Sequence, residues 1–360
     1  MFSHLKKLDW ILIISAVLLV GIGLLFIYSS SHGDFLNFKK QIIFFGAGFF
    51  LMILLSFFDY RILKENSYLI LALYLFCLVG LLGLFFFAPE IRGTKSWYKL
   101  GPVSVDPIEF TKIILIILLA KYFSMRHVEM YRFRHILLSG FYVLVPGILI
   151  FMQPNVSSVL ILVAIWIAVL FISGINLRHF LILSLIFLLI FALSWSFLLK
   201  DYQKERVISF VFPQYQPLKT GWSQNQAQIA IGSGGIFGRG LGKGSQTQYG
   251  FLSEPQTDFI FAAICEELGF FGIAILMIIF MVLGWRIFKL ARTCQSNFPR
   301  LFAIGFLAFL VFQAFINIGM NLGILPVIGV PLPLISYGGS NLISVFLGLG
   351  ILQSIKTHGA

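Results

Sequence analysis

Asp258 is an acid at the junction between the longest polar stretch of the chain and a hydrophobic run. The junction predicts the first turn of a helix entering a membrane, and a helix N-terminus favours the ionised carboxylate that a general base needs. Glu266 follows on the same helix face, roughly 12 Å deeper at 1.5 Å per residue, with Glu267 beside it. An acidic first turn alone would be unremarkable, but three acids in one hydrophobic span are rarely passive. Residues 220–267 are therefore the first candidate for chemistry.

Glu109 and Lys112 form a second candidate near a membrane boundary. They are three residues apart, which places them on one helix face where they can pair. Each charge costs about 2.5 to 3.5 kcal/mol at mid-membrane on insertion scales, and less near an interface. The pair indicates either a binding site or a structural ion pair.

Four cations outside the hydrophobic runs could bind an anionic group. Arg92 and Lys95 stand near two aromatic residues, which suits an anionic lipid-linked substrate or an aromatic belt with snorkelling side chains. Arg239 and Lys243 lie among closely spaced glycines, whose backbone amides can approach a phosphate, although a flexible turn is the alternative. Gly244 stands where a nucleotide-binding P-loop needs Ser or Thr, which excludes that motif.

Two further polar segments adjoin hydrophobic runs. Asn155 follows Pro154 at the start of a run, where a helix cap is the simplest interpretation. Three prolines in the segment 317–341 preclude a regular helix there, and its glycines permit close backbone approach, so it would shape one wall of a cavity. Ser336 and Gly338 in this segment are candidates for contact with a substrate.

The composition requires membrane helices to position these residues. Hydrophobic residues make up 59% of the 360 residues, charged residues 11%, and the mean hydropathy is +0.96, far outside the soluble range. No alternating pattern suggests a barrel, so the expected fold is all-α, a polytopic membrane protein of about ten helices. The predicted spans are 9–29, 38–58, 66–87, 107–123, 136–153, 155–173, 178–199, 258–286, 301–323 and 335–355.

The charges predict the orientation of this single transmembrane domain, residues 1–360. With about ten spans and the N-terminus inside, every inner segment is basic, as the positive-inside rule requires, and both termini are cytoplasmic. The long loop 200–257, between the seventh and eighth spans, then lies outside. The formal net charge of +12 is scattered between the runs, so it does not indicate nucleic acid. The three cysteines lack metal-ligand spacing and predict neither a disulfide nor a metal site.

Several motifs together resemble the SEDS family of bacterial cell-wall polymerases. The matching stretches cover nearly the whole chain in the family's order: RGTKSWYKLG, PIEFTK, QPN, AIGSGGIFGRGLGKGSQ, EPQTDFIFA, EELGF and NIGMNLGILPVIGVPLPLISYGGS. The NIGM start of the last stretch is more similar to the elongation branch than to the division branch. Asn155 departs from the family, because many members have Asp there. Asp106 with Ile108 replaces the usual Gln-Pro-Ser-Glu form.

The resemblance implies an inverting glycosyltransferase that polymerises lipid II into glycan strands on the outer face of the bacterial cytoplasmic membrane, for cell elongation and shape. It implies an undecaprenyl-pyrophosphate leaving group. The implied partners are a class B penicillin-binding protein and other membrane proteins of the elongation complex. A divalent cation, Mg or Mn, is implied by the family and by pyrophosphate chemistry, although no ligand cluster is evident.

The resemblance also assigns roles to the candidate residues. By its position in TDFIF, Asp258 matches the family's catalytic acid, and Glu109 and Lys112 match its intramembrane polar pair. The cations that could bind pyrophosphate are Arg92, Lys95, Arg239 and Lys243. The residues expected to support the site are Glu266, Glu267 and Asn155.

Two other functions remain open on the sequence. A transporter that flips lipid II would have a path lined by buried charges, namely Glu109, Lys112, Glu266 and Glu267. Transporters often show paired half-repeats, and no repeat is evident. A non-catalytic scaffold for the penicillin-binding protein would leave Asp258 dispensable.

Overall fold

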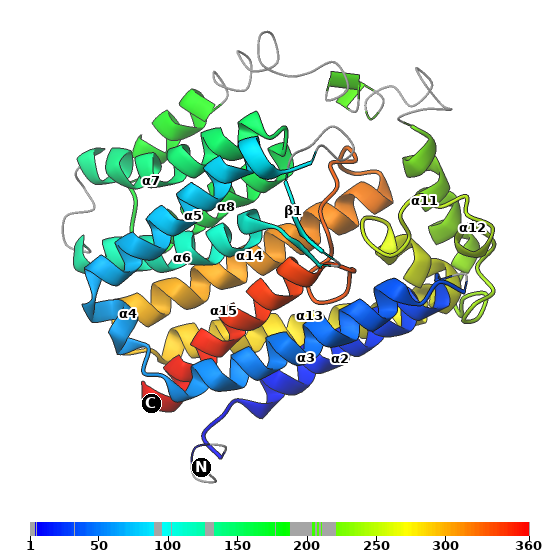
Figure 1. Cartoon of the computed structure of the whole chain (residues 1–360), viewed down its shortest axis with the longest axis horizontal. Helices are drawn as coiled ribbons and strands as arrows, with labels where there is room; N and C mark the ends of the chain where they lie inside the picture. Colours follow the sequence, from blue (N-terminus) through cyan, green and yellow to red (C-terminus); the bar gives the residue numbers. More distant parts are fainter. Residues whose placement is uncertain are drawn as a thin grey trace.

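Long helices run along the longest dimension of the molecule (Figure 1). A computed structural model describes residues 4, 6–31, 33–89, 96–101, 103–126, 133–176, 178–187, 204–205, 207–208, 210 and 221–359. Arg92, Lys95 and the end of the predicted seventh span lie outside these residues.

The long helices coincide with the predicted spans. They are α2 Trp10–Ser29, α3 Leu36–Phe57, α5 Ser67–Phe87, α6 Pro107–Arg126, α7 Phe133–Met152, α8 Val156–Ile172, α13 Ile260–Thr293, α14 Asn297–Leu322 and α15 Gly339–His358. A further apolar helix, Arg178–Phe187, covers the described part of the seventh span. Within the residues that the structure describes, six helices are long and apolar enough to cross a membrane by length and composition. The prediction of an all-α polytopic membrane protein is confirmed.

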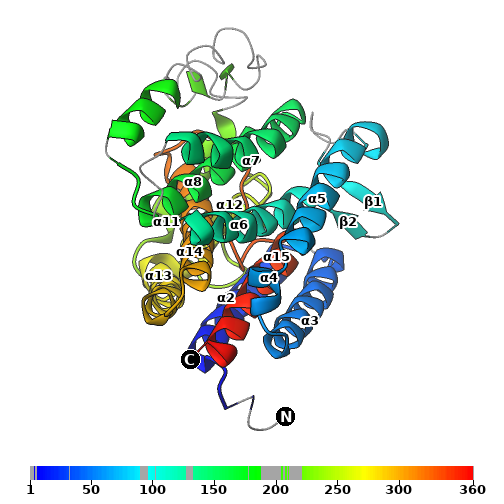
Figure 2. The ribbon, with the colours of Figure 1, turned by 90° about the vertical axis from the view of Figure 1, so that its left-hand side faces the viewer.

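The bundle is built around α14, which packs against α6, α8 and α13, while α3 lies along α15. Figure 2 shows α13 and α14 on one side and α3 and α5 on the other, with α2 and α15 between them. Small residues allow the close approach of α3 and α15, since Gly48 faces the Phe346 ring and Gly350 faces the backbone of Met52. Both termini lie at one end of the bundle (Figure 1).

A short hairpin leads into α6. Strand β1, Tyr98–Leu100, pairs antiparallel with β2, Val103–Val105, around Gly101, whose φ of 64° suits a tight turn. The Tyr98 hydroxyl donates to the Gly80 carbonyl of α5 at 2.6 Å. Pro107 then begins α6. Proline is tolerated there because the N–H groups of the first helical turn have no acceptor within the helix. The hairpin thus fixes the start of the helix that carries Glu109 and Lys112.

The long segment before Asp258 is not a loop throughout. It contains α11, Trp222–Gly234, and the single turn α12, Ser245–Gln248, at the end of the bundle opposite the termini (Figure 1). Helix α11 packs on α13 and α14 with a face of Ala227, Ala230 and Gly234. These side chains are too small to give a strong hydrophobic pattern, so the sequence did not predict this helix.

Two predicted helix starts also need correction. Helix α13 begins at Ile260 rather than at Asp258, continues to Thr293 and is broken at Gly269, where φ is 67°. Helix α15 begins at Gly339 rather than at 335, because the irregular chain continues to Gly338. The prolines correctly predicted an irregular segment, which occupies residues 323–338. Short α4, Arg61–Glu65, connects α3 to α5 at the end of the bundle near the termini.

Candidate active site

Asp258 lies in a turn, two residues before the first residue of α13. The turn is closed by the backbone amides of Thr257 and Phe259, which each donate to the Glu254 carbonyl at 3.2 Å. The prediction that Asp258 occupies the first helical turn is therefore wrong. Its carboxylate still adjoins the helix N-terminus, and it is partly exposed, as a group that meets a substrate must be.

Two buried amides hold the backbone of Asp258. The Nδ2 atoms of Asn317 and Asn321, both on α14, each donate to the Asp258 carbonyl at 3.0 Å. The Asn321 Oδ1 atom also accepts from the amide of Ala262 at 3.1 Å, in the first turn of α13. Because both asparagines are fully buried and belong to a long helix, the acid is attached to the rigid part of the bundle.

The irregular segment 323–338 holds the same turn from another side. The Ser336 hydroxyl donates to the Thr257 carbonyl at 2.6 Å, and the Tyr337 amide donates to the Gln256 carbonyl at 2.8 Å. Ser336 is 4% exposed, and its hydroxyl holds the turn. The Gly338 amide donates to Gln41 Oε1 at 3.2 Å.

The same segment also borders the Asp258 carboxylate. A Cβ atom on Gly329 would lie 3.4 Å from Asp258 Oδ2, so the backbone at 329 is a near neighbour of the acid. Asn317 Nδ2 donates to Val330 at 2.7 Å as well as to Asp258, which ties the segment and the turn to one side chain. The prediction that this segment shapes the surroundings of the site agrees with these contacts.

Glu266 and Glu267 connect α13 to α12. Both carboxylates are fully buried. Glu266 accepts from the amides of Gln246 and Thr247 at 2.7 and 3.0 Å and from the Thr247 hydroxyl at 2.8 Å. Glu267 accepts from the Ser29 hydroxyl of α2 at 2.8 and 2.9 Å. Glu266 therefore holds α12 against α13, and Glu267 holds α2 against α13. They are two of the four charges that a transporter path would need.

The glycine-rich segment packs against the break in α13. A Cβ atom on Gly238, whose φ is 78°, would collide with the Glu267 carbonyl, and one on Gly269 would collide with the Gly238 amide. Only glycine fits such positions, because positive φ disfavours a side chain and the backbones touch. These two glycines therefore allow the glycine-rich segment to pack closely against α13.

The two cations of the glycine-rich segment remain exposed. Arg239 donates from Nη1 to the Ser245 hydroxyl at 2.9 Å and from Nε to the Ser233 carbonyl at 3.3 Å. Lys243 follows the positive-φ residues Gly240 and Gly242. An exposed guanidinium anchored by two bonds can still present its remaining donors to an anion.

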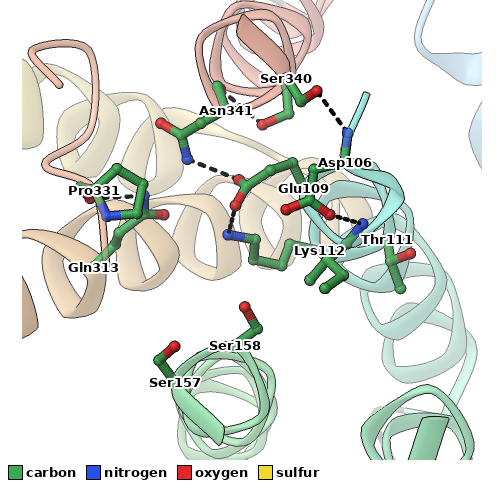
Figure 3. A network of polar contacts seen from close by, with 12 residues as sticks. Asp106, Glu109, Thr111, Lys112, Ser157, Ser158, Gln313, Pro331, Ser340 and Asn341 are labelled. Carbon is green, nitrogen blue, oxygen red and sulfur yellow. Dashed lines mark hydrogen bonds and ion pairs between the residues drawn. The ribbon is translucent and has the colours of Figure 1, made fainter. Parts of the chain in front are cut away.

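A second polar cluster surrounds Glu109 (Figure 3). Lys112 Nζ lies 2.7 Å from Glu109 Oε1, and Asn341 Nδ2 donates to Glu109 Oε2 at 2.7 Å. Lys112 is 1% exposed and also lies 5.0 Å from the centre of the Phe309 ring. The sequence correctly placed the pair on one helix face, and α14 and α15 supply the further partners that a buried ion pair needs.

Asp106 joins this cluster immediately before α6. Its Oδ1 accepts from the Ile108 amide at 2.9 Å, and its own amide donates to the Ser340 hydroxyl at 2.8 Å. Burial and the nearby Glu109 carboxylate raise the pKa of Asp106 to about 8. The carboxyl is thus mostly protonated at neutral pH.

Asn155 caps α8. Its Oδ1 accepts from the Ser158 amide at 3.2 Å and from the Ser157 hydroxyl at 3.0 Å. The hydroxyls of both serines point from α8 toward the Lys112 side of the polar cluster (Figure 3). The capping interpretation of Asn155 therefore holds, and the residue supports the cluster through the position of α8.

Sequence reasoning missed the row of amides on α14. Gln313, Asn317 and Asn321 recur every four residues on one helix face and are all fully buried. Gln313 Nε2 donates to the Pro331 carbonyl at 3.0 Å, so all three bind backbone outside α14. Amide side chains at helical spacing in an apolar run could have indicated this row, because each amide needs a hydrogen-bond partner there.

No group of three His, Cys, Asp or Glu side chains that could hold a metal ion occurs in the part of the chain that the structure describes. Glu266 and Glu267, the nearest acids along α13, are bonded to α2 and α12. A single carboxylate held by its backbone can act as a base toward a hydroxyl that reaches it.

Comparison with known proteins places the chain among cell-wall and cell-division proteins. Residues 9–360 match the family model FTSW_RODA_SPOVE, described as "Cell cycle protein". The peptidoglycan glycosyltransferase MrdB of Escherichia coli K12 is 38% identical, over 79% of this chain and 77% of its own.

Two solved structures are similar over almost the full length. One belongs to a study of a peptidoglycan synthase complex that coordinates polymerization and crosslinking, with a TM-score of 0.84, 31% identity and 97% of each chain covered. The other is the rod shape determining protein RodA of Thermus thermophilus, with a TM-score of 0.74, 30% identity, and 98% of this chain and 97% of that chain covered.

Proposed function

This chain belongs to the FtsW, RodA and SpoVE family of membrane proteins, and from that premise we propose that it is a peptidoglycan glycosyltransferase. It polymerises lipid II into glycan strands on the outer face of the cytoplasmic membrane, in the elongation role typical of RodA. The observation that carries the proposal is the attachment of Asp258 to two buried asparagines of α14. A catalytic group must be held in a fixed position, whereas an acid that is merely solvated at the surface needs no such attachment.

Asp258 is the proposed general base. Its carboxylate takes the proton from the 4-hydroxyl of the acceptor sugar while that oxygen bonds to the anomeric carbon of the donor. The bond from that carbon to the pyrophosphate oxygen breaks with inversion, and undecaprenyl pyrophosphate leaves with the electron pair. The proton then passes from Asp258 to water. Pyrophosphate is a good leaving group, so one carboxylate suffices where glycoside hydrolysis requires two.

The leaving pyrophosphate requires positive charge. We assign this role to Arg239 and Lys243, which are exposed on the segment that packs against the break in α13, and to Arg92 and Lys95. A divalent cation, Mg or Mn, would enter with the pyrophosphate as part of the substrate and offset its charge. No step in the proposed reaction depends on a metal held by the protein alone.

The Glu109–Lys112 pair is proposed to position one wall of the substrate site. Asn341, which bonds to Glu109, directly follows the segment that borders Asp258. The ion pair can therefore influence the acid through one short piece of chain. Gly338, the N-cap residue of α15, lies between the two in the chain.

We further propose the surroundings in which the enzyme works. Its termini lie on the cytoplasmic side, as the basic inner segments require, and Asp258 faces outward. A class B penicillin-binding protein is the expected partner, in keeping with the similarity to a chain from a complex that couples polymerization to crosslinking. Other membrane proteins of the elongation complex would join it.

The decisive experiment compares wild type with Asp258→Asn and Asp258→Ala. Each protein is purified with its partner, incubated with fluorescent lipid II, and its glycan strands are separated on a gel. Removing a general base should reduce the polymerisation rate by about a hundredfold or more. Glu65→Gln, at an exposed acid beyond α3, is the matched control and should polymerise normally.

Three outcomes separate the alternatives. Unchanged polymer from both Asp258 variants, with folding verified by thermal unfolding, would remove the base assignment and favour a scaffold. Lipid II that crosses sealed vesicles without polymer formation would favour a transporter. Loss of polymer with normal binding of lipid II supports the proposed enzyme.

A further inference from the structure

A cavity of about 380 Å³ lies at the end of the bundle where α14 begins. Its wall combines Lys64 at the end of α4, Lys121 and Ser124 on α6, and Ser296 and Asn297 at the start of α14. The candidate active site does not use it. Asn321, which holds Asp258, is 24 residues along α14 from Asn297, a distance of about 36 Å at 1.5 Å per residue.

The cavity is positively charged. Lys64 and Lys121 line it, and its described wall contains no Asp or Glu. The Lys121 ammonium donates to the Lys64 carbonyl, which brings the two lysine segments together and leaves that ammonium two further donors. Both side chains are partly buried, so their charge is less screened than that of a surface lysine.

The start of α14 adds to this charge. Ser296 is its N-cap residue, and no side chain caps the first turn within the described residues. Serine and asparagine at 296 and 297 line the cavity, so the positive end of the helix dipole adjoins the two lysines. Helix N-termini flanked by cations bind phosphate groups in many proteins.

We propose that this cavity binds the phosphate of an anionic compound, either the phosphodiester of a membrane phospholipid or a soluble phosphate. The apolar side chains of Met125 and Phe298 complete the wall, and Met125 is 66% exposed. A headgroup phosphate can therefore enter from the boundary between helix ends and lipid. Basic pockets between membrane helices bind anionic headgroups in this way.

Thermal unfolding tests the site. The purified protein in a neutral detergent is titrated with short-chain phosphatidylglycerol, with phosphatidylcholine of the same chain length, and with inorganic phosphate at constant ionic strength. The anionic ligand should raise the Tm with saturation, whereas phosphatidylcholine should not. A rise with phosphatidylglycerol alone identifies the membrane lipid as the source, and an equal rise with inorganic phosphate identifies a soluble one.

Charge variants locate the effect. Lys64→Gln with Lys121→Gln keeps the number of side-chain heavy atoms and the polarity but removes both charges, and should weaken the apparent affinity about tenfold or more. Lys289→Gln with Arg292→Gln removes two exposed cations of α13 outside the cavity, and should change the affinity less than about twofold. Equal weakening in both double variants would show a general surface-charge effect and overturn the proposal.

A filling variant gives an independent test that keeps both lysines. Ser124→Phe occupies the cavity and should abolish the Tm rise. Retention of wild-type affinity in Ser124→Phe, or the absence of any saturable rise in the wild type, would also overturn the proposal. If the lysine double variant fails to fold, Ser124→Phe and the single Lys64→Gln variant decide the question.

Discussion

At the scale of residues, the acids of the candidate site differ in the described contacts that hold them. Glu266 accepts hydrogen bonds from α12 and Glu109 accepts from Lys112 and Asn341. Asp258 instead is held through its backbone, by Asn317 and Asn321. Holding the carbonyl fixes the position of the side chain without using the carboxylate oxygens in these two bonds.

The first prediction concerns these two amides. Asn317→Ala and Asn321→Ala should each slow polymerisation by about tenfold to a hundredfold, because small displacements of a reacting group have effects of this size. The measurement is the initial rate at saturating lipid II together with the affinity for lipid II, which should change little. Asn66→Ala, at the cap of α5, is the control for loss of an amide elsewhere, and a rate equal to wild type in both α14 variants would contradict the positioning role.

The second prediction concerns pH and Asp106. Its folded-state pKa of about 8 lies above the value near 3.9 expected in an unfolded chain. The folded state therefore binds more protons between these values, so this residue makes stability fall as pH rises from about 4 to 8. The Tm of Asp106→Asn should fall less than that of the wild type over this range.

Asp34→Asn provides the comparison for this pH experiment. Asp34 is exposed at the start of α3, where it accepts from the Leu36 amide, so Asp34→Asn controls for the loss of a carboxyl group outside the polar cluster. Parallel Tm curves for the wild type and Asp106→Asn would refute the raised pKa.

At the scale of elements, the glycine-rich segment 235–240 and the break in α13 form one unit. The amides of Arg239 and Gly240 donate to the Glu266 and Glu267 carbonyls at 3.0 and 2.9 Å. The amides of Phe270 and Phe271 donate back to residues 235 and 236. The break at Gly269 thus exposes backbone groups that the glycine-rich segment satisfies, as buried backbone groups require.

The third prediction follows from the Glu266 carboxylate. Glu266→Gln replaces one acceptor oxygen by an amide group, so two of the buried donors of α12 lose their partner, at about 1 to 3 kcal/mol for each. Residues 244–248 should then exchange amide hydrogens faster, as measured by hydrogen exchange and mass spectrometry. Glu65→Gln should leave this exchange unchanged. Unaltered protection in Glu266→Gln would mean that α12 is held by other contacts.

At the scale of the whole molecule, the two ends of the bundle are stabilised differently. The end with α11 and α12 uses the acids of α13, whereas the end with the termini contains a largely buried ion pair between Asp9 and Arg286. The Arg286 side chain in this pair is 21% exposed. The Asp9 backbone amide also donates to Gln353 Oε1 of α15 at 2.9 Å, and Gln353 Nε2 donates to the Asp9 carbonyl at 3.1 Å. The pair therefore joins α2, α13 and α15 at one point.

The fourth prediction is a double-mutant cycle at this point. Asp9→Asn should destabilise the protein by about 1 to 3 kcal/mol, because Arg286 loses a partner in a partly buried position. Adding Arg286→Gln should recover part of the loss, since no unpaired charge remains. Thermal unfolding in one detergent measures both, and additive effects would show that the two residues do not interact.

The amino-acid sequence by itself determined the membrane class, the positions of nearly all long helices and the candidate roles of Asp258, Glu109 and Lys112. These properties depend on neighbouring residues. A long apolar run indicates a membrane helix, and a proline interrupts a helix. A charge in an apolar run costs free energy and therefore indicates a structural or functional role. The spacing of Glu109 and Lys112 also predicted their contact, because residues three apart share a helix face.

Only the tertiary structure decided what holds those groups. The partners of the Asp258 turn are 59, 63 and 79 residues away in the chain, and no local pattern encodes which distant amide meets which carbonyl. The same applies to α11, whose small side chains form a helix face only against α13, and to Gly238, which is required by a backbone on another element. Transfer free energy and helical periodicity are properties of consecutive residues, whereas hydrogen-bond partners and close contacts exist only once distant segments have packed.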